Sequence, residues 1–294
     1  MQKRLLFIVN PRAGRLKSHA PLFDAVEIFS SAGYLVSVRC TSGRGDATDI
    51  AASKGAGFDT VVCCGGDGTL SETVTGLMRL EKRPVVGYIP AGTTNDFASC
   101  LHIPKDPVVA AKIAVGGVKR RLDVGWFNDR NFVYVASFGA FSATSYNASQ
   151  AVKNTLGQFA YFLEGIHDLA DIRPFGMELE ADGEKFDGEY LYGSVSNSTS
   201  IGGLVKLKPD EVGMDDGKYE LLLVRSPKNP LEIQTLAAAL LSQHYEHSGI
   251  VFRHVSEVKI HSSQEIRWSL DGEFEPGAPE ISIRNDYRAL TLMT

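Results

Sequence analysis

Residues 60–69 read TVVCCGGDGT, an apolar run that leads into a loop with three glycines. The run Thr60–Cys64 has the length and composition of a buried strand. A helix is expected after the loop, from about Leu70 to Leu80. Glycines let a backbone approach a phosphate closely, and the free N–H groups at a helix start favour an anion. The stretch therefore predicts a strand, a phosphate-binding loop and a helix in succession.

The same alternation of strand and helix continues on both sides of this stretch. Strands are expected at Leu5–Asn10, Tyr34–Cys40 and Pro84–Ile89, and helices at Ala20–Ala32 and from Asp46 to about Ala56. Continuous apolar strands that alternate with helices are typical of a parallel sheet covered on both faces. We therefore expect an α/β domain over residues 1–122.

The second half of the chain has short strands separated by turn signals, which is typical of an antiparallel sandwich. The expected strands are 121–127, 132–137, 176–181, 190–197, 219–224, 255–261, 265–270 and 280–284, and helices are expected at 152–169 and 231–243. A β-sandwich domain over residues 123–286 is predicted, with residues 287–294 as a candidate strand that returns to the first domain.

Composition and charge narrow the class of protein. The chain has 294 residues, of which 44% are apolar and 22% are charged, and its net charge is −5. An acidic balance argues against non-specific nucleic-acid binding, which needs a basic surface. No apolar run approaches the roughly 20 residues of a membrane span. The four cysteines show no zinc-site or disulfide spacing, so reduced thiols and a cytosolic location are expected.

Three loops that follow strands carry the polar residues of the first half. They are Asn10–Gly14, Gly65–Thr69 and Pro90–Asp96. In a doubly wound sheet, ligands bind at the carboxyl ends of the strands, where such loops gather. The Asp67 carboxylate would repel a phosphate. A divalent cation between the two groups would remove this repulsion, so the residue indicates a metal ion here. The loops match neither the P-loop nor the dinucleotide-binding glycine pattern.

The second and third loops together, GGDGT at 65–69 and PAGTTNDF at 90–97, with Asn10-Pro11 after the first strand, resemble the diacylglycerol kinase catalytic family of soluble bacterial lipid kinases. The resemblance extends over nearly the whole chain. It implies an α/β nucleotide-binding domain, similar to those of phosphofructokinase and NAD kinase, followed by a β-sandwich domain, with the active site in the cleft between them. The implied activity is ATP-dependent phosphorylation of a lipid hydroxyl with Mg²⁺.

The resemblance also implies roles for particular residues. The ATP contacts that it implies are Asn10, Pro11, Arg12, Ala13, Gly14, Thr41, Gly65, Gly66, Asp67, Gly68, Thr69, Glu72, Gly92, Thr93 and Asn95. Asp67, Asp96 and Asp123 match positions of a carboxylate–water–magnesium network. A second, structural magnesium site would use the Asp216 side chain and the carbonyl groups of Gly213 and Lys218. A plain turn explains this last segment equally well.

The family's catalytic base is a glutamate in an Asp-Gly-Glu tripeptide, and this chain has three of them. They begin at Asp182, Asp187 and Asp271. Asp-Gly is a common hairpin turn, so the first two are interpreted as turns. The third matches the family's position. Glu273 is therefore the expected base, and Asp271 is its orienting or metal-linked neighbour, although a turn alone would explain this tripeptide too.

Two other functions stay open at this point. One is a small-molecule kinase similar to NAD kinase, which the 90–97 loop disfavours. The other is a nucleotide- or lipid-binding protein without turnover. For a lipid kinase, we expect a lipid substrate met at a membrane surface by transient, peripheral association, no nucleic-acid partner, and a homodimer as a candidate assembly. The apolar stripe of the 152–169 helix either packs on the sandwich or lines a groove for acyl chains.

Overall fold

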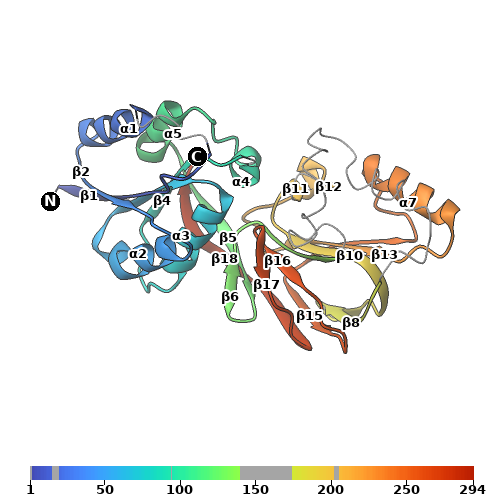
Figure 1. The fold of residues 1–294 in the computed structure, drawn as a ribbon. Coiled ribbons are helices and arrows are strands. Elements are labelled where there is room, and N and C mark those ends of the chain that lie inside the picture. Colours follow the sequence, from blue (N-terminus) through green and yellow to red (C-terminus); the bar gives the residue numbers. More distant parts are fainter. Residues whose placement is uncertain (1, 15–19, 94, 140–173, 202–204) are drawn as a thin grey trace. The chain divides into compact units, whose positions relative to one another are not determined.

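The computed structural model describes residues 2–14, 20–93, 95–139, 174–201 and 205–294. These residues form two compact units (Figure 1). Unit 1 consists of Met1–Val124 and Tyr287–Thr294, and unit 2 consists of Gly125–Asp286. The expected helix at 152–169, with its apolar stripe, lies outside the described residues. No helix in the described part of the chain is both long and apolar enough to cross a bilayer.

Unit 1 has the predicted α/β architecture. Its elements are β1 (Lys3–Val9), α1 (Ala20–Ser31), β2 (Tyr34–Cys40), α2 (Asp46–Lys54), η1 (Gly55–Gly57), β3 (Thr60–Gly65), α3 (Asp67–Met78), β4 (Val85–Pro90), α4 (Asp96–Cys100), α5 (Pro107–Gly116), part of β5 (Lys119–Phe127) and the last part of β18 (Glu280–Met293). The sheet order is β2-β1-β3-β4-β18, and each neighbouring pair is parallel.

Burial explains why these segments form strands. Leu5–Val9 and Thr60–Gly65 are buried throughout, because helices cover both faces of the sheet. In Figure 1, α1 and α5 lie on one side of the sheet, and α2 and α3 lie on the other. Phe7 of β1 and Phe29 of α1 pack edge to face, with ring centroids 5.2 Å apart.

One helix boundary and two whole helices in unit 1 differ from the predictions. Helix α3 begins at Asp67 rather than near Leu70, so Asp67 belongs to the first helical turn and not to the loop. Helices α4 and α5 were not predicted. The start of α5 has a clear sequence signal, because the Asp106 side chain accepts hydrogen bonds from the N–H groups of Val108 and Val109 and Pro107 follows it.

Unit 2 is the predicted β-sandwich. Its elements are part of β5, β6 (Arg130–Phe132), β7 (Val135–Gly139), β8 (Phe175–Ala181), β9 (Glu184–Lys185), β10 (Gly188–Ser196), β11 (Ser200–Ile201), β12 (Val205–Lys206), η4 (Pro209–Glu211), β13 (Tyr219–Arg225), α7 (Pro230–Leu241), β14 (Ile250–Val255), β15 (Glu257–His261), β16 (Trp268–Leu270), β17 (Glu273–Glu275) and the first part of β18. The strand pairs with a known register within this unit are antiparallel.

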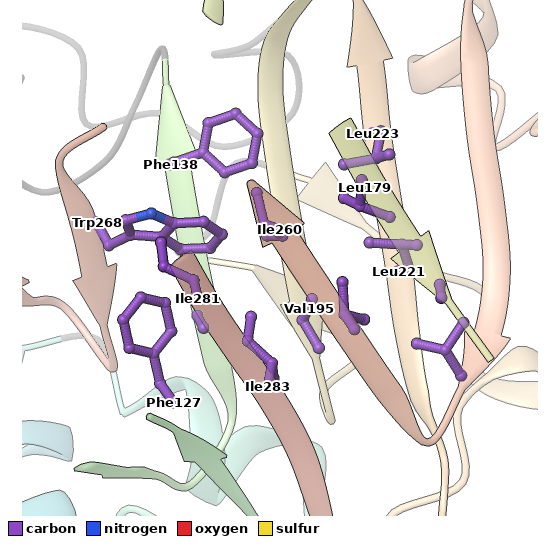
Figure 2. Packing of buried hydrophobic residues seen from close by; sticks show 14 of the residues in the cluster. Phe127, Phe138, Leu179, Val195, Leu221, Leu223, Ile260, Trp268, Ile281 and Ile283 are labelled. Atoms are coloured by element: carbon purple, nitrogen blue, oxygen red, sulfur yellow. The ribbon is translucent and has the colours of Figure 1, made fainter. Parts of the chain in front are cut away.

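The core of unit 2 lies between the layers of strands (Figure 2). Trp268 is its largest buried side chain, and its ring lies 5.0 Å from that of Phe127 and 4.8 Å from that of Phe138. Leu221, Ile260 and Ile283 join this cluster from three other strands. One apolar core therefore fixes the strands that carry the polar residues of this unit.

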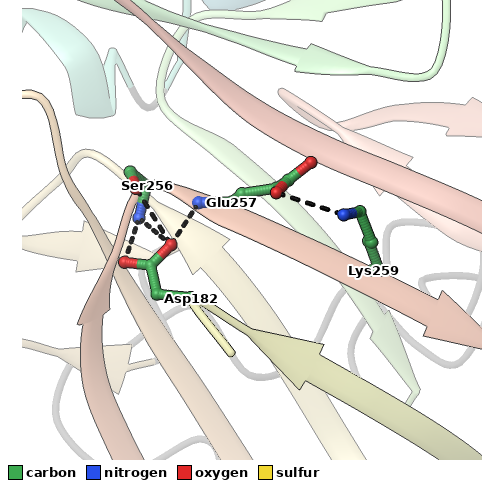
Figure 3. A network of polar contacts seen from close by, with 4 residues as sticks. All are labelled: Asp182, Ser256, Glu257 and Lys259. Atoms are coloured by element: carbon green, nitrogen blue, oxygen red, sulfur yellow. Dashed lines mark hydrogen bonds and ion pairs between the residues drawn. The ribbon is translucent and has the colours of Figure 1, made fainter. Parts of the chain in front are cut away.

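Two predicted strands of unit 2 are each interrupted. At both interruptions, an aspartate carboxylate from a hairpin turn accepts hydrogen bonds from the backbone. The segment expected at 255–261 breaks at Ser256, whose N–H and Oγ groups donate to the Asp182 carboxylate, as does the N–H of Glu257 (Figure 3). Although partial burial opposes it, these hydrogen bonds keep the pKa of Asp182 below its usual value. The segment expected at 132–137 breaks at 133–134, where the Asp271 carboxylate accepts the N–H groups.

The last strand is longer than expected. Instead of a strand at 280–284 and a separate returning strand within 287–294, β18 is continuous from Glu280 to Met293. Its first part pairs with β15, and Leu292 pairs with Val86 of β4 in unit 1. Thr294 and Val118 exchange two backbone hydrogen bonds, each by its N–H and its carbonyl group. Unit 1 is therefore built from both ends of the chain.

Candidate active site

The glycine loop at the end of β3 leads directly into α3. Gly65 ends the strand, and Gly66 is the N-cap residue of the helix. Because glycine has no side chain, no N-cap side chain accepts hydrogen bonds from the first N–H groups of α3. A helix start of this kind offers donors and a positive dipole end to an anion. The backbone at Gly66–Thr69 is therefore suited to bind phosphate.

The second and third loops touch through their backbones. A Cβ added to Gly92 would lie 2.6 Å from the Cα of Gly66, so only glycine fits this contact. Asn95 then turns the chain into α4 with a left-handed backbone of φ 56°. Its side chain closes the loop on Gly92, because Oδ1 accepts the Gly92 N–H at 2.9 Å and Nδ2 donates to the Gly92 carbonyl at 2.8 Å. The buried Asn95 therefore shapes the third loop.

The Asp67 carboxylate joins the second loop to the start of α4. Its oxygens accept the N–H groups of Asp96 at 3.1 Å and Phe97 at 3.4 Å. Burial nevertheless raises the pKa of Asp67 above its usual value, because these hydrogen bonds offset only part of the lost hydration. Asp67 thus caps the start of α4, and its carboxylate lies beside the two glycine loops.

Asn10 connects the first loop to the second. Its Nδ2 donates to Thr69 Oγ1 at 3.0 Å, and its Oδ1 accepts the N–H of Arg12 at 3.0 Å. The Asn10 N–H also donates to the carbonyl of Cys64, the residue before Gly65. The structure therefore brings the first predicted loop to the same edge of the sheet as the second.

Thr41 and Glu72 lie around the loop that follows β2. The Thr41 N–H donates to the carbonyl of Val9, which places Thr41 beside the first loop. The Glu72 carboxylate accepts the N–H groups of Gly45 at 2.8 Å and Ala47 at 3.3 Å, at the start of α2. Glu72 therefore caps a neighbouring helix, and its contact with ATP stays a prediction.

The three carboxylates of the expected magnesium network are held separately. Asp123 is buried, and its Oδ1 accepts the N–H of Arg288 at 2.7 Å. The Asp67 carboxylate accepts a hydrogen bond from the backbone N–H of Asp96. Among the described residues, no three His, Cys, Asp or Glu side chains gather around a shared metal position. A direct three-carboxylate site is therefore absent there, and a network through water stays a prediction.

Glu273 begins β17 after the two-residue turn Asp271-Gly272. Both turn residues have positive φ, 51° and 87°, as a type I′ hairpin requires. The Asp271 carboxylate accepts the N–H groups of Val133, Tyr134 and Val135 at 2.7–3.1 Å, so it is a buried structural anchor. Glu273 itself is half-buried and pairs with Leu270. The turn interpretation and the base interpretation are therefore compatible at this tripeptide.

The tripeptide Asp182-Gly183-Glu184 forms the same kind of hairpin, but its glutamate is exposed and paired. Asp182-Gly183 has φ values of 46° and 88° between β8 and β9. Glu184 is exposed, and both of its carboxylate oxygens accept hydrogen bonds at 3.0 Å from Arg253. This pairing keeps the pKa of Glu184 below its usual value, which makes Glu184 a poor base.

The expected structural magnesium site is a tight turn before β13. Asp216 Oδ1 accepts the N–H of Lys218 at 2.9 Å, and Oδ2 folds back over Gly213, where an added Cβ would lie 2.3 Å from it. The segment is therefore a turn, which both interpretations allow, and the metal stays a prediction. Glu220, two residues further on, is buried in the apolar strand β13, and the sequence analysis did not single it out.

The contact between Gly66 and Gly92 gives a testable expectation. Gly92→Ala places a methyl group against backbone atoms that cannot move aside, so we expect a loss of about 1–3 kcal/mol in the free energy of unfolding and a higher KM for ATP. Urea unfolding and steady-state kinetics measure both. Gly116→Ala is the matched control, because nothing lies within 4 Å of its added Cβ. An unchanged Gly92→Ala protein would show that the two loops do not depend on their close approach.

Two family models together match almost the whole chain. The model described as the diacylglycerol kinase catalytic domain matches residues 4–127. The model described as the YegS C-terminal NAD kinase β-sandwich-like domain matches residues 135–294. These ranges correspond to the α/β and sandwich halves of the chain.

Curated proteins and solved structures agree with these models. A diacylglycerol kinase from Bacillus subtilis (strain 168) is 36% identical over 274 residues, which cover 92% of this chain and 90% of that protein. A diacylglycerol kinase from Staphylococcus aureus (strain MRSA252) is 34% identical, with coverages of 93% and 87%. A solved structure of a putative diacylglycerol kinase from Bacillus anthracis str. Sterne is 28% identical, with a TM-score of 0.82 over 99% of this chain and 95% of that one. These relatives favour a lipid kinase over the NAD kinase-like alternative.

Proposed function

This chain belongs to the diacylglycerol kinase catalytic family and is a lipid kinase; from that premise we propose that it transfers the γ-phosphoryl group of ATP to the free hydroxyl of diacylglycerol or a related lipid. The product is then a phosphatidic-acid-type lipid. Mg²⁺ is the proposed metal.

The observation that carries this proposal is the meeting of three loops at one sheet edge. Asn10 bonds to Thr69, Gly66 packs on Gly92, and Asp67 bonds to the start of α4. Phosphoryl transfer needs positioning and charge neutralisation more than covalent chemistry. Backbone N–H groups at Gly66–Thr69 would position the phosphates, because the contacts between the loops fix these N–H groups before ATP binds.

The donor set beside the loops fits a magnesium ion bound together with nucleotide phosphates. Asp67 and Asp96 offer hard carboxylate oxygens, and Mg²⁺ takes one or two carboxylates alongside phosphate oxygens and water. When bound, the ion would neutralise charge on the phosphates. The burial that raises the pKa of Asp67 also means that its proton competes with the metal in acid.

The proposed transfer step is a single displacement at phosphorus. Glu273 takes the proton of the lipid hydroxyl, the hydroxyl oxygen forms a bond to the γ-phosphorus, and the bond to the β–γ bridging oxygen breaks. ADP leaves with the electron pair of that bond, and the proton is on the Glu273 carboxyl. Asp271 is a positioning residue in this scheme, since its carboxylate fixes the hairpin by accepting three backbone hydrogen bonds.

An assay with radiolabelled ATP and a panel of acceptors tests the function. The purified chain is mixed with micelles of diacylglycerol, monoacylglycerol or a sphingoid base, with NAD⁺, or with no acceptor. We expect label in a lipid product that requires Mg²⁺ and disappears with EDTA. Label in NADP⁺ would favour the NAD kinase-like alternative, and no transfer to any acceptor would favour a binding protein without turnover.

We also propose that the chain meets its lipid by reversible binding to the bilayer surface. The acceptor class supports this, because a diacylglycerol resides in the membrane. Co-sedimentation with lipid vesicles tests it, with the unbound fraction as the control. Dimerisation stays a prediction that light scattering can check.

A further inference from the structure

Helix α7 has one buried face and one exposed face without charge. It extends from Pro230 to Leu241 on the outside of unit 2 (Figure 1). The buried side chains are Ile233, Leu236, Ala237, Ala239 and Leu240. The exposed positions after Pro230 are Leu231, Gln234, Thr235, Ala238 and Leu241. They follow the spacing of one helical face, and none of them carries a charge.

The single charged side chain of α7 is held at the start of the helix. The Glu232 carboxylate accepts the N–H of Lys228 at 2.7 Å and Nδ2 of Asn229 at 3.0 Å. The shorter helix α2, by contrast, has three charged residues among nine. The solvent side of a surface helix usually carries charged residues. The exposed face of α7 therefore lacks the groups that favour contact with water.

Two leucines are the most apolar members of this face. Leu231 is 68% exposed and Leu241 is 51% exposed. They lie near opposite ends of the helix, about 15 Å apart along its axis at the usual rise per residue. Both side chains can enter an apolar medium together, because the residues between them are small or uncharged.

A lysine lies at each end of the same helix. The exposed Lys228 precedes α7 by one turn residue and a proline. At the other end, the carbonyl of the exposed Lys206 accepts hydrogen bonds from Gln243 Nε2 and the Tyr245 hydroxyl, both at 3.2 Å. Ammonium groups on flexible stems suit a surface that is negative above an apolar interior. The exposed Glu246 offsets part of this charge, so the leucines carry more of the attraction.

We propose that the exposed face of α7 docks on a lipid bilayer, with Leu231 and Leu241 inserted below the headgroups and Lys206 and Lys228 at headgroup level. The proposal rests on the proposed function, because a lipid acceptor is what brings the chain to a membrane. With 12 residues, α7 is too short to span the bilayer, so it lies in the plane of the interface.

The composition and size of the face favour a bilayer over a protein partner. Protein interfaces are enriched in aromatic residues, methionine and arginine, whereas leucine, serine and threonine are rare at their energetic centres. The helix face measures about 18 Å by 10 Å, or roughly 180 Å², from the rise and diameter of a helix. A stable interface buries roughly 800 Å² on each partner. A bilayer has no such threshold, since each inserted side chain contributes separately.

Binding to vesicles without ATP tests the proposal. With vesicles of phosphatidylcholine and phosphatidylglycerol, we expect the double variant Leu231→Gln/Leu241→Gln to bind about 10-fold more weakly or worse. Glutamine keeps the helix propensity of leucine. Leu35→Gln in β2 is the matched control, because Leu35 is 55% exposed and belongs to unit 1, and its binding should not change.

The lysines give a second arm with a different signature. Lys206→Gln/Lys228→Gln should lower binding to vesicles that contain phosphatidylglycerol by about 5-fold or more, and binding to pure phosphatidylcholine should stay the same. An equal loss on both kinds of vesicle would show that the lysines do not act through lipid charge and would overturn their place at the headgroups.

A tryptophan at the centre of the face reports insertion directly. Ala238→Trp should show fluorescence at shorter wavelength when vesicles are added, because the indole moves out of water. This variant decides the matter if the double leucine variant does not fold. An unshifted spectrum, or unchanged vesicle binding in a folded double leucine variant, would overturn the proposal. A change from dimer to monomer in that variant, with vesicle binding unchanged, would assign the face to a second copy of the chain.

Kinase assays separate this proposal from the proposed function. With a short-chain diacylglycerol dissolved below its micelle concentration, the double leucine variant should phosphorylate at the rate of the unaltered chain. Vesicle binding through α7 without any phosphoryl transfer would overturn only the kinase chemistry. Transfer by a chain whose vesicle binding does not depend on Leu231 and Leu241 would overturn only the docking surface.

Discussion

Replacing Glu273 with glutamine is expected to lower kcat by about 10² to 10⁴, the usual contribution of a positioned general base, with little change in KM for ATP. Glutamine keeps the size of the side chain and the pairing with Leu270, and the Asp271-Gly272 turn is untouched. What is lost is the ability to take the hydroxyl proton. Steady-state kinetics with diacylglycerol in mixed micelles, together with urea unfolding, measure both parts of this expectation.

Glu184→Gln is the matched control because Glu184 follows the same kind of Asp-Gly turn. Its carboxylate pairs with Arg253 on the surface, where water screens the pair, so its loss should change stability little and leave kcat unchanged. A full rate in Glu273→Gln, or an equal loss in Glu184→Gln, would show that the base is not at Glu273.

Asp67→Asn is expected to lower kcat/KM by about 10³ or more, because it removes a charge proposed to hold the metal against the phosphates. The change also has a structural cost. Asparagine keeps one acceptor oxygen, and its NH₂ group would face the N–H of Asp96 or Phe97, so about 1–3 kcal/mol of stability is lost as well. Kinetics over a range of Mg²⁺ concentrations, well below the Tm, measure the catalytic part.

Gly92→Ala separates the two roles of Asp67. That variant disturbs the same pair of loops but keeps the carboxylate, so its stability should fall and its dependence on Mg²⁺ should not change. If Asp67→Asn retains the full rate at saturating Mg²⁺, its carboxylate is only the cap of α4. The raised pKa of Asp67 adds a check, since activity should rise with pH as this carboxyl loses its proton.

The strands of unit 1 were predictable because burial on both faces leaves a strong local signal. Leu5–Val9 and Thr60–Gly65 are apolar along their length, and glycine loops follow them. The capping role of Asp67 was not predictable, because its partners lie about thirty residues further along the chain. Local propensity carries no information on such a contact.

The breaks in the sandwich strands were missed for a similar reason. Ser256 and Val133 lie in apolar, β-prone segments, and what interrupts them is a carboxylate from a distant hairpin. Asp182 was interpreted correctly as a turn residue, but the turn expected at Asp187-Gly188 is absent, because Gly188 already begins β10. At Asp271 the turn was only the alternative interpretation, and a turn residue does not show where its side chain points. Glu220 shows the opposite case: an acidic residue inside an apolar strand is visible in the sequence, whereas its complete burial is visible only in the structure.

The return of β18 to unit 1 has a consequence for how the chain is made. During synthesis, residues 1–124 leave the ribosome before unit 2, whereas the strand that lies beside β4 is translated only after unit 2. Until then, one edge of the parallel sheet is unpaired, and the carboxylate of Asp123 lacks the Arg288 N–H that it binds in the finished fold. The nascent unit 1 is thus exposed to edge-to-edge aggregation until β18 has been made, and a chain cut at Asp286 would keep that open edge permanently.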